Sequence, residues 1–173
     1  MLQMKLEPPA THYLNSAIGW TELGNAVEAL RELDGISAEF QSHPEVMETL
    51  WQALAQLKLW KDCVSLAEEV IRLHPGKSAG WVHRSFALHE MGETEDALQM
   101  LLPALARFPD SWLIRYNLAC YYCRTKNPEQ GMRFFEQACR LGDFSQLKSM
   151  ALEDDDLLDI RSKIAASNAG GFV

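Results

Sequence analysis

The chain has 173 residues, of which 47% are hydrophobic and 23% are charged, a balance typical of a globular domain with a real core and not of a disordered chain. Its net charge of −8, with no long run of Lys or Arg, argues against nucleic-acid binding, which usually needs a basic stripe. The N-terminus lacks the apolar core of a signal peptide, and no apolar run approaches the length of a membrane span. We therefore expect a cytoplasmic protein that does not enter a membrane, with its four cysteines as reduced thiols.

The first segment, residues 1–9, contains the sequence LEPP, and it is predicted to be an extended arm because proline disfavours helix in the residue before it. From about residue 10 the sequence repeats every 34 residues. One column of this repeat is always small, which indicates that two helices touch closely there, and the column four residues later is always apolar. The small column is Ala29, Cys63, Ala97 and Gly131, and the apolar column is Leu33, Ala67, Leu101 and Phe135.

Each repeat is predicted to form two helices, because its apolar residues recur every three or four positions on either side of a short break. In the third repeat the break is MGETED, where Gly92 can end one helix in the left-handed conformation and Thr94 can cap the next. In the fourth repeat it is KNPE, with Asn127 as the cap and Pro128 at the first helical position. A proline ends the second helix of each of the two middle repeats.

This pattern resembles the tetratricopeptide repeat (TPR) family. The third repeat matches the family signature best, through Trp81, Leu88, Gly92, Ala97, Leu101, Ala104 and Pro109. The resemblance covers about residues 10–145 and implies an all-α fold, a right-handed α-solenoid of about four TPR helix pairs followed by C-terminal capping helices. The expected repeats are approximately residues 10–43, 44–77, 78–111 and 112–145.

Two positions depart from the family pattern. Gln41 stands where the first repeat should have its terminating proline, so we expect its second helix to be longer than usual or broken at Asp34–Gly35. Trp51 occupies a column that otherwise holds small residues. We expect this ring to push the first two repeats apart or to point into a groove.

After residue 145 the pattern changes. Residues 146–166 are predicted to form capping helices, one ending near Ala151 and one from about Asp155, because the end of a solenoid exposes an apolar face that must be covered. Residues 167–173 are expected to be frayed. The apolar side chains proposed to cover the end of the solenoid are Leu157, Leu158, Ile160 and Ile164.

No motif in the sequence supports catalysis, a cofactor or a metal site. Cys120 and Cys123 are spaced C-x-x-C, but no second pair follows and both lie within a helix, so packing or groove lining is favoured over metal or redox chemistry. His83 and His89 are six residues apart, which is not the spacing that chelates a metal from one helix. The run EDDD, residues 153–156, is explained by the preference of acidic side chains for helix N-termini.

In the TPR family the first helices of successive repeats line a concave groove, and the resemblance carries this role to specific columns. The expected groove residues are Leu14, Ile18, Glu22, Glu48, Gln52, Gln56, Val82, Phe86, His89, Glu90, Leu113, Tyr116, Asn117, Cys120, Cys123 and Arg124. Only Asn117 and Arg124 could contact a carboxylate, so we expect no clamp for the acidic tails of chaperones. The C-terminal half of this lining is apolar and aromatic.

We therefore predict a non-catalytic adaptor or scaffold that holds a peptide or helix of another protein in its groove, with Phe86 and Tyr116 as anchors. The alternative is a structural or assembly role, as a homodimer or as a chaperone-like, cytoskeletal or secretion-associated TPR protein. The groove could be filled by a partner, by a second copy or by the chain's own N-terminal arm. Val82 and Phe86 could also simply pack against neighbouring helices.

Overall fold

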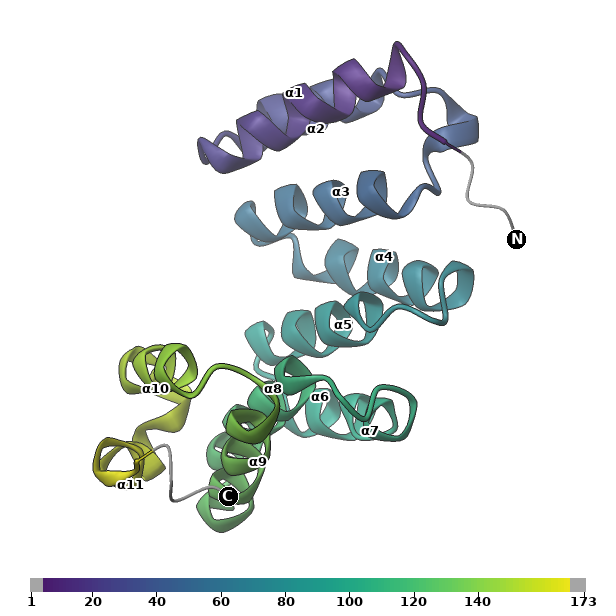
Figure 1. Ribbon diagram of the computed structural model, residues 1–173. Helices are drawn as coiled ribbons and strands as arrows, with labels where there is room; N and C mark the ends of the chain where they lie inside the picture. Colours follow the sequence, from purple (N-terminus) through teal and green to yellow (C-terminus); the bar gives the residue numbers. More distant parts are fainter. Residues whose placement is uncertain (1–4, 169–173) are drawn as a thin grey trace. The chain divides into compact units, whose positions relative to one another are not determined.

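The computed structural model describes residues 5–168, and within them the chain forms helices and no strands, which confirms the predicted all-α class (Figure 1). It divides into two compact units, an N-terminal unit ending at His83 and a C-terminal unit beginning at Arg84. No helix in the described part of the chain is long and apolar enough to cross a membrane. The helices are α1 (Ala10–Glu22), α2 (Ala26–Asp34), α3 (Pro44–Gln56), α4 (Trp60–Leu73), α5 (Ala79–Glu90), α6 (Thr94–Leu101), α7 (Ala104–Arg107), α8 (Trp112–Arg124), α9 (Pro128–Leu141), α10 (Phe144–Glu153) and α11 (Arg161–Ala166), with short 3₁₀ helices η1 (Ala38–Phe40) and η2 (Asp155–Ile160).

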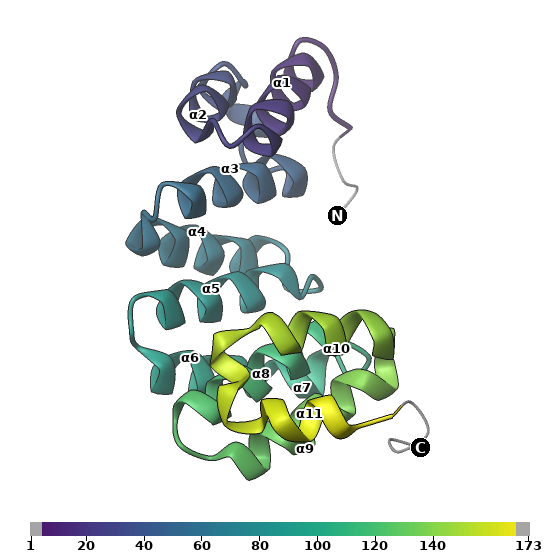
Figure 2. The ribbon, with the colours of Figure 1, turned by 90° about the vertical axis from the view of Figure 1, so that its left-hand side faces the viewer.

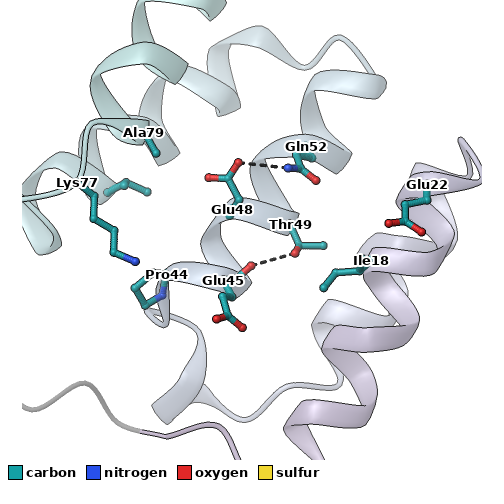
Figure 3. Close-up of a pocket in the computed structure, with 10 residues that line it drawn as sticks. Ile18, Glu22, Pro44, Glu45, Glu48, Thr49, Gln52, Lys77 and Ala79 are labelled. Carbon is teal, nitrogen blue, oxygen red and sulfur yellow. Dashed lines mark hydrogen bonds between the residues drawn. The ribbon is translucent and has the colours of Figure 1, made fainter. Parts of the chain in front are cut away.

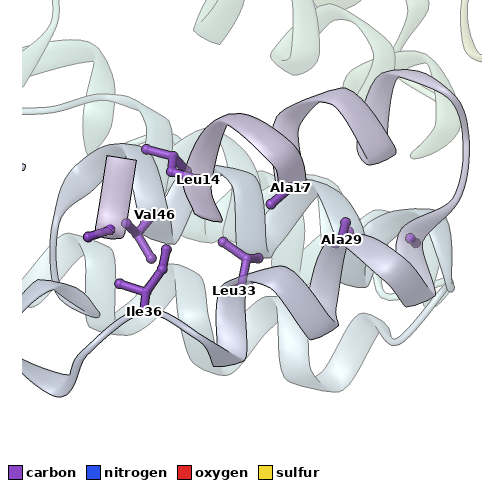
Figure 4. Close-up of a cluster of buried hydrophobic side chains, with 9 residues drawn as sticks. Leu14, Ala17, Ala29, Leu33, Ile36 and Val46 are labelled. Carbon is purple, nitrogen blue, oxygen red and sulfur yellow. The ribbon is translucent and has the colours of Figure 1, made fainter. Parts of the chain in front are cut away.

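The core of the N-terminal unit lies where α1, α2 and α3 meet (Figure 4). Ala17 and Ala29 are fully buried at the contact of α1 with α2, where their small side chains let the two backbones approach. Leu33, Ile36 and Val46 fill the space beside them. The small and apolar columns of the repeat are thus core positions, as predicted, and the same holds for their members in the other repeats.

The turn between the two helices of each repeat contains one residue with positive φ, at positions that are 34 residues apart. Gly24 and Gly92 have φ of 75° and 83°, which confirms the left-handed conformation expected at Gly92. Lys58 and Lys126 take the same place with φ of 56° and 64°, although a side chain disfavours this conformation. The period therefore fixes the turn geometry even where the residue is not glycine.

The caps of the second helices agree with the sequence in part. The side-chain oxygen of Asn127 accepts a hydrogen bond from the backbone N–H of Gln130, at 3.2 Å, as predicted. The expectation for Thr94 is wrong, because Glu93 holds the cap position and no side chain caps α6. The hydroxyl of Thr94 is instead hydrogen-bonded to Nδ1 of His89, at 2.9 Å.

The second helix of the first repeat is broken and not lengthened, since α2 ends at Asp34 and the chain continues through Gly35 into η1. Gln41 takes over the terminating role that proline has in the middle repeats. Its side-chain amide donates to the backbone carbonyls of Leu33, at 3.2 Å, and Ile36, at 2.7 Å. These bonds tie Gln41 to the last turn of α2 and to a residue just beyond that helix.

Trp51 is buried, so the expectation that it points into an open groove is wrong. Its ring stacks on the ring of His83, with centroids 3.9 Å apart and an interplanar angle of 8°. The large side chain is accommodated by this flat contact between α3 and the beginning of α5.

The second helix of the third repeat is interrupted, because Pro103 separates α6 from α7. Proline has no N–H to donate and clashes with the preceding turn, which explains the break. In the fourth repeat α8 and α9 pack closely at Gly131, where a Cβ atom would collide with the sulfur of Cys123. Glycine is therefore the residue that fits this helix contact.

The C-terminal segment folds back on the fourth repeat, where η2 contacts both α8 and α9 (Figure 2). Leu157, Ile160 and Ile164 are fully buried, as expected for a cap, whereas the expectation for Leu158 is wrong because 53% of it is exposed. The predicted second capping helix is a 3₁₀ helix followed by α11. The expected extended arm lies partly, in residues 1–4, outside the described residues, as does most of the expected frayed tail, residues 169–173.

Candidate protein-binding surfaces

The N-terminal unit contains a pocket of about 490 Å³ between α1 and α3, bounded on its other side by the residues that lead into α5 (Figure 3). Four residues that the resemblance assigned to the groove line it: Ile18, Glu22, Glu48 and Gln52. The remaining lining residues are Pro44, Glu45, Thr49, Val70, Lys77 and Ala79.

Carboxylates dominate the charge of this pocket. Glu22 comes from α1, Glu45 and Glu48 come from α3, and Lys77 is the one cation among the described residues that line the pocket. Partial burial alone would raise the pKa of Glu48, but the hydrogen bonds to His83 and Gln52, together with charge interactions with His83 and Lys77, outweigh it and hold this pKa below its usual value. The oxygen of Glu48 lies 3.4 Å from His83 and 3.2 Å from the amide nitrogen of Gln52. Glu48 is therefore ionised at neutral pH.

The pocket also has an apolar wall. Ile18 is 36% exposed on α1, and Figure 3 shows its side chain directed toward Thr49 of α3. The hydroxyl of Thr49 donates to the backbone carbonyl of Glu45, at 2.9 Å, so it is already engaged within the helix. A long cationic side chain suits this arrangement, because its aliphatic stem can pack on Ile18 while its charged head reaches a carboxylate.

Two predicted groove residues of the N-terminal unit are not accessible. Leu14 belongs to the core cluster of α1, α2 and α3, and Val82 is buried on α5. Gln56 is engaged through its side-chain amide, which donates to the backbone carbonyl of Thr21 at 2.8 Å.

In the C-terminal unit the predicted groove face of α8 is covered by the chain itself. Tyr116, Cys120 and Cys123 were expected to line the groove, with packing as an alternative for the two cysteines, and all three are buried. The hydroxyl of Tyr116 donates to Oδ2 of Asp154, at 2.9 Å, and the thiol of Cys120 contacts the same oxygen at 3.5 Å. The cover is therefore the part of the chain that begins at Asp154, after α10, and not a partner, a second copy or the N-terminal arm.

A second carboxylate of this segment contacts α5 and α8. Asp156 Oδ2 lies 2.8 Å from Nε2 of His89, and its Oδ1 lies 3.5 Å from Nε of Arg124. The hydrogen bond from His89 holds the pKa of Asp156 below its usual value, against the opposing effect of burial. We call this set, Tyr116, His89 and Arg124 with Asp154 and Asp156, the latch.

The helix-capping explanation of the EDDD run is correct but incomplete. Oδ1 of Asp154 accepts from the backbone N–H of Asp156, at 2.9 Å, and so caps η2. The other oxygen of Asp154 and the carboxylate of Asp156 form the latch. The acidic run was thus the available sequence signal for a contact with α8, but nothing in its local pattern specified that partner.

Cys120, Asp154 and Asp156 place three ligand atoms within 4.8 Å of one another. These carboxylates already accept hydrogen bonds from Tyr116 and His89, so a cation would have to displace the latch. Burial raises the pKa of the Cys120 thiol well above its ordinary value and that of Cys123 to about 11. Both cysteines are therefore protonated packing residues at neutral pH, a poor starting point for metal or redox chemistry.

Five predicted groove residues remain at or near the surface of the C-terminal unit. Phe86 and Leu113 are more than one-third exposed, Glu90 and Arg124 are exposed, and Asn117 is half-buried. Phe86, one of the two expected anchors, is therefore exposed to solvent, whereas Tyr116, the other, is buried.

No protein-family model matches the sequence, and no curated protein matches it. Solved structures do. MamA (residues 41 to the end) from Desulfovibrio magneticus RS-1 is 22% identical, with 94% of each chain covered and a TM-score of 0.67. TTC0263, a TPR protein from Thermus thermophilus, is 17% identical, with 91% of this chain and 97% of that chain covered and a TM-score of 0.68. Identities this low establish a likeness of fold, and the chain therefore has the fold of a tetratricopeptide-repeat protein, as its 34-residue period predicted.

Proposed function

We propose that the protein is a non-catalytic scaffold that binds a peptide or helical segment of another protein. The observation that carries this proposal is the pocket between α1 and α3, four of whose lining residues are in the columns that the TPR resemblance assigns to partner binding. A pocket between rigid helices supports such a role because it offers a preformed surface with both apolar and polar contacts. The fold likeness to TTC0263 is consistent with it.

The proposed binding site differs from the one that the sequence favoured. The apolar half of the groove was expected to be the main contact, with Tyr116 as an anchor, but the C-terminal segment covers that residue. The proposal therefore rests on Ile18, Glu48 and Gln52 in the N-terminal unit. Phe86 remains a candidate contact in the C-terminal unit because it is exposed.

Self-association is the second candidate function, and one observation favours it. Trp20, Leu23 and Val27 are exposed around the turn between α1 and α2, and Leu23 is exposed to 78%. Large apolar side chains gathered at the end of a helical repeat array are typical of a surface that another element covers. A second copy of the chain could supply that element.

A pull-down from the source cell tests the two candidates together. The bait is the full chain, compared with Ile18→Asp, which places a charge in the pocket, and with Leu158→Asp, which changes an exposed leucine elsewhere. We expect a defined protein to be retained by the wild type and by Leu158→Asp and lost from Ile18→Asp, with all three baits monomeric by light scattering. A dimeric bait that captures nothing would favour self-association.

A further inference from the structure

We propose that the pocket between α1 and α3 selects partner segments in which a Lys or Arg side chain lies next to an aliphatic one. This inference rests on the proposed function, because it specifies the chemistry of the segment that the scaffold binds. It is carried by the charge of the pocket, by its apolar wall and by a comparison with the latch.

The residues that line the pocket determine its charge. Glu22, Glu45 and Glu48 face one cation, Lys77, so the pocket carries a net negative charge at neutral pH. Carboxylates that line a concave, partly desolvated surface attract cationic side chains and disfavour acidic ones. The pocket thus discriminates between segments by the sign of their charge.

The apolar wall makes the preference more specific. The exposed side of Ile18 offers an aliphatic contact within the same pocket as the three carboxylates. A Lys or Arg stem packs on such a surface while its charged head reaches a carboxylate, and a neighbouring aliphatic side chain extends the contact. A small metal ion would gain nothing from Ile18, whereas a protein segment can use both the aliphatic contact and the carboxylates.

The latch shows that side chains at the repeat positions of Glu48 and Gln52 can bind a chain segment. Glu48 and Gln52 are two repeats, or 68 residues, before Tyr116 and Cys120. In the C-terminal unit these positions present hydrogen-bond donors, and the segment that lies on them is acidic, with Asp154 accepting from Tyr116. In the N-terminal unit they present a carboxylate and an amide, which fit a segment that brings donors and positive charge.

The chain's own arm does not fill the pocket in the part that the structure describes. Lys5 and Leu6 line a neighbouring pocket, beside Thr11 and His43, and this pocket shares Glu45 with the one between α1 and α3. Of the described arm, residues 5–9, none lines the pocket between α1 and α3. The described arm thus leaves the pocket accessible to a segment from another molecule.

The test uses three fluorescein-labelled twelve-residue peptides in which leucine alternates with lysine, glutamine or glutamate. Binding to the full chain is measured by fluorescence anisotropy at low and at physiological salt. We expect the lysine peptide to bind most tightly, the glutamate peptide to bind least, and added salt to reduce the difference.

Two matched variants locate the effect. Glu22→Gln with Glu45→Gln removes two pocket charges, and Asp62→Asn with Glu68→Gln removes two exposed charges from α4. The pocket variant should weaken binding of the lysine peptide by about three- to tenfold, as expected for two partly exposed ion pairs, while the α4 variant should leave it unchanged. Equal losses in both variants, equal binding of the lysine and glutamate peptides, or no binding of the lysine peptide would overturn the inference.

The outcome is separable from that of the proposed function. If the cellular partner is lost from Ile18→Asp but fully retained by the Glu22→Gln, Glu45→Gln variant, the scaffold role stands and the preference for a basic segment is wrong. If the wild-type bait captures nothing and is a dimer that the pocket variants dissociate, the occupant is a second copy, and both proposals fall.

Discussion

Side chains at equivalent positions of the repeat are accessible in the N-terminal unit and covered in the C-terminal unit. In the N-terminal unit Glu48 and Gln52 line a pocket, whereas in the C-terminal unit Tyr116 and Cys120 lie beneath the segment that begins at Asp154. The difference does not come from the repeat itself, since the helices and turns recur with the same period. It comes from the tail, which follows the last repeat and covers the groove face of α8.

The cover should therefore be the part of the C-terminal unit most sensitive to truncation of a side chain. Leu157 is fully buried and Leu158 is largely exposed, so the two neighbours form a matched pair. We expect Leu157→Ala to lower the free energy of unfolding by about 2–5 kcal/mol and Leu158→Ala to change it by less than about 0.5 kcal/mol. Urea denaturation followed by circular dichroism measures both. Equal effects would show that the tail does not pack as a cap.

The helix contact beneath the cover gives the next largest expected effect. At Gly131 a Cβ atom would meet the sulfur of Cys123 and, at 3.1 Å, the carbonyl oxygen of Ala119. Gly131→Ala should therefore cost about 1–3 kcal/mol through overpacking. Gly19→Ala on α1 is the control, because outside its own helix backbone no atom lies within 4 Å of its added methyl, and it should stabilise by up to about 1 kcal/mol. Thermal unfolding of the two variants should thus shift in opposite directions.

The latch makes the stability of the C-terminal unit depend on pH. The pKa of Asp156 is lowered in the folded protein, chiefly by the hydrogen bond from His89, so its stabilising contribution is present above the ordinary carboxyl pKa of 3.8. That contribution is lost as the pH falls through the lowered, folded-state pKa. We expect Asp156→Asn to be less stable than the wild type at pH 6 and to lose less stability on acidification. Parallel pH profiles from chemical denaturation would contradict the assignment.

The smallest expected effect concerns the turns, where both units are built alike. Lys126 and Lys58 have positive φ, at the places taken by Gly92 and Gly24 in the other repeats. Lys126→Gly and Lys58→Gly should each stabilise by up to about 1 kcal/mol, because glycine adopts this conformation without a steric cost. A loss of stability in either variant would mean that the lysine side chain makes a contact that outweighs the backbone gain.

Most of the fold was accessible from the sequence because it follows from local and periodic rules. The small column at Ala29 and Ala97, the left-handed turn at Gly92 and the cap at Asn127 each depend on residues close by in the chain. The break at Pro103 could also have been predicted, since proline inside a helix is a strong local signal.

The remaining features depend on contacts between distant residues, which periodicity does not encode. Gln41 replaces a terminating proline through bonds to Leu33 and Ile36, and a glutamine carries no such signal in its own neighbourhood. The burial of Tyr116 depends on Asp154, which is 38 residues away and outside the repeat. The sequence could therefore assign groove residues by their positions in the repeat, but it could not show which of these residues stay accessible.

The central claim is that equivalent positions are open in the N-terminal unit and covered in the C-terminal unit, and thiol labelling tests it most directly. The four native cysteines are buried, so the Gln52→Cys variant adds one accessible thiol at the position equivalent to Cys120. The reaction of the folded variant with a thiol reagent is followed by mass spectrometry with site assignment. We predict that position 52 reacts at least about a hundredfold faster than Cys120, whose labelling requires the latch to open and whose pKa is raised by burial. Comparable rates at the two positions would contradict the account, because they would show that the C-terminal segment does not cover the groove face of α8.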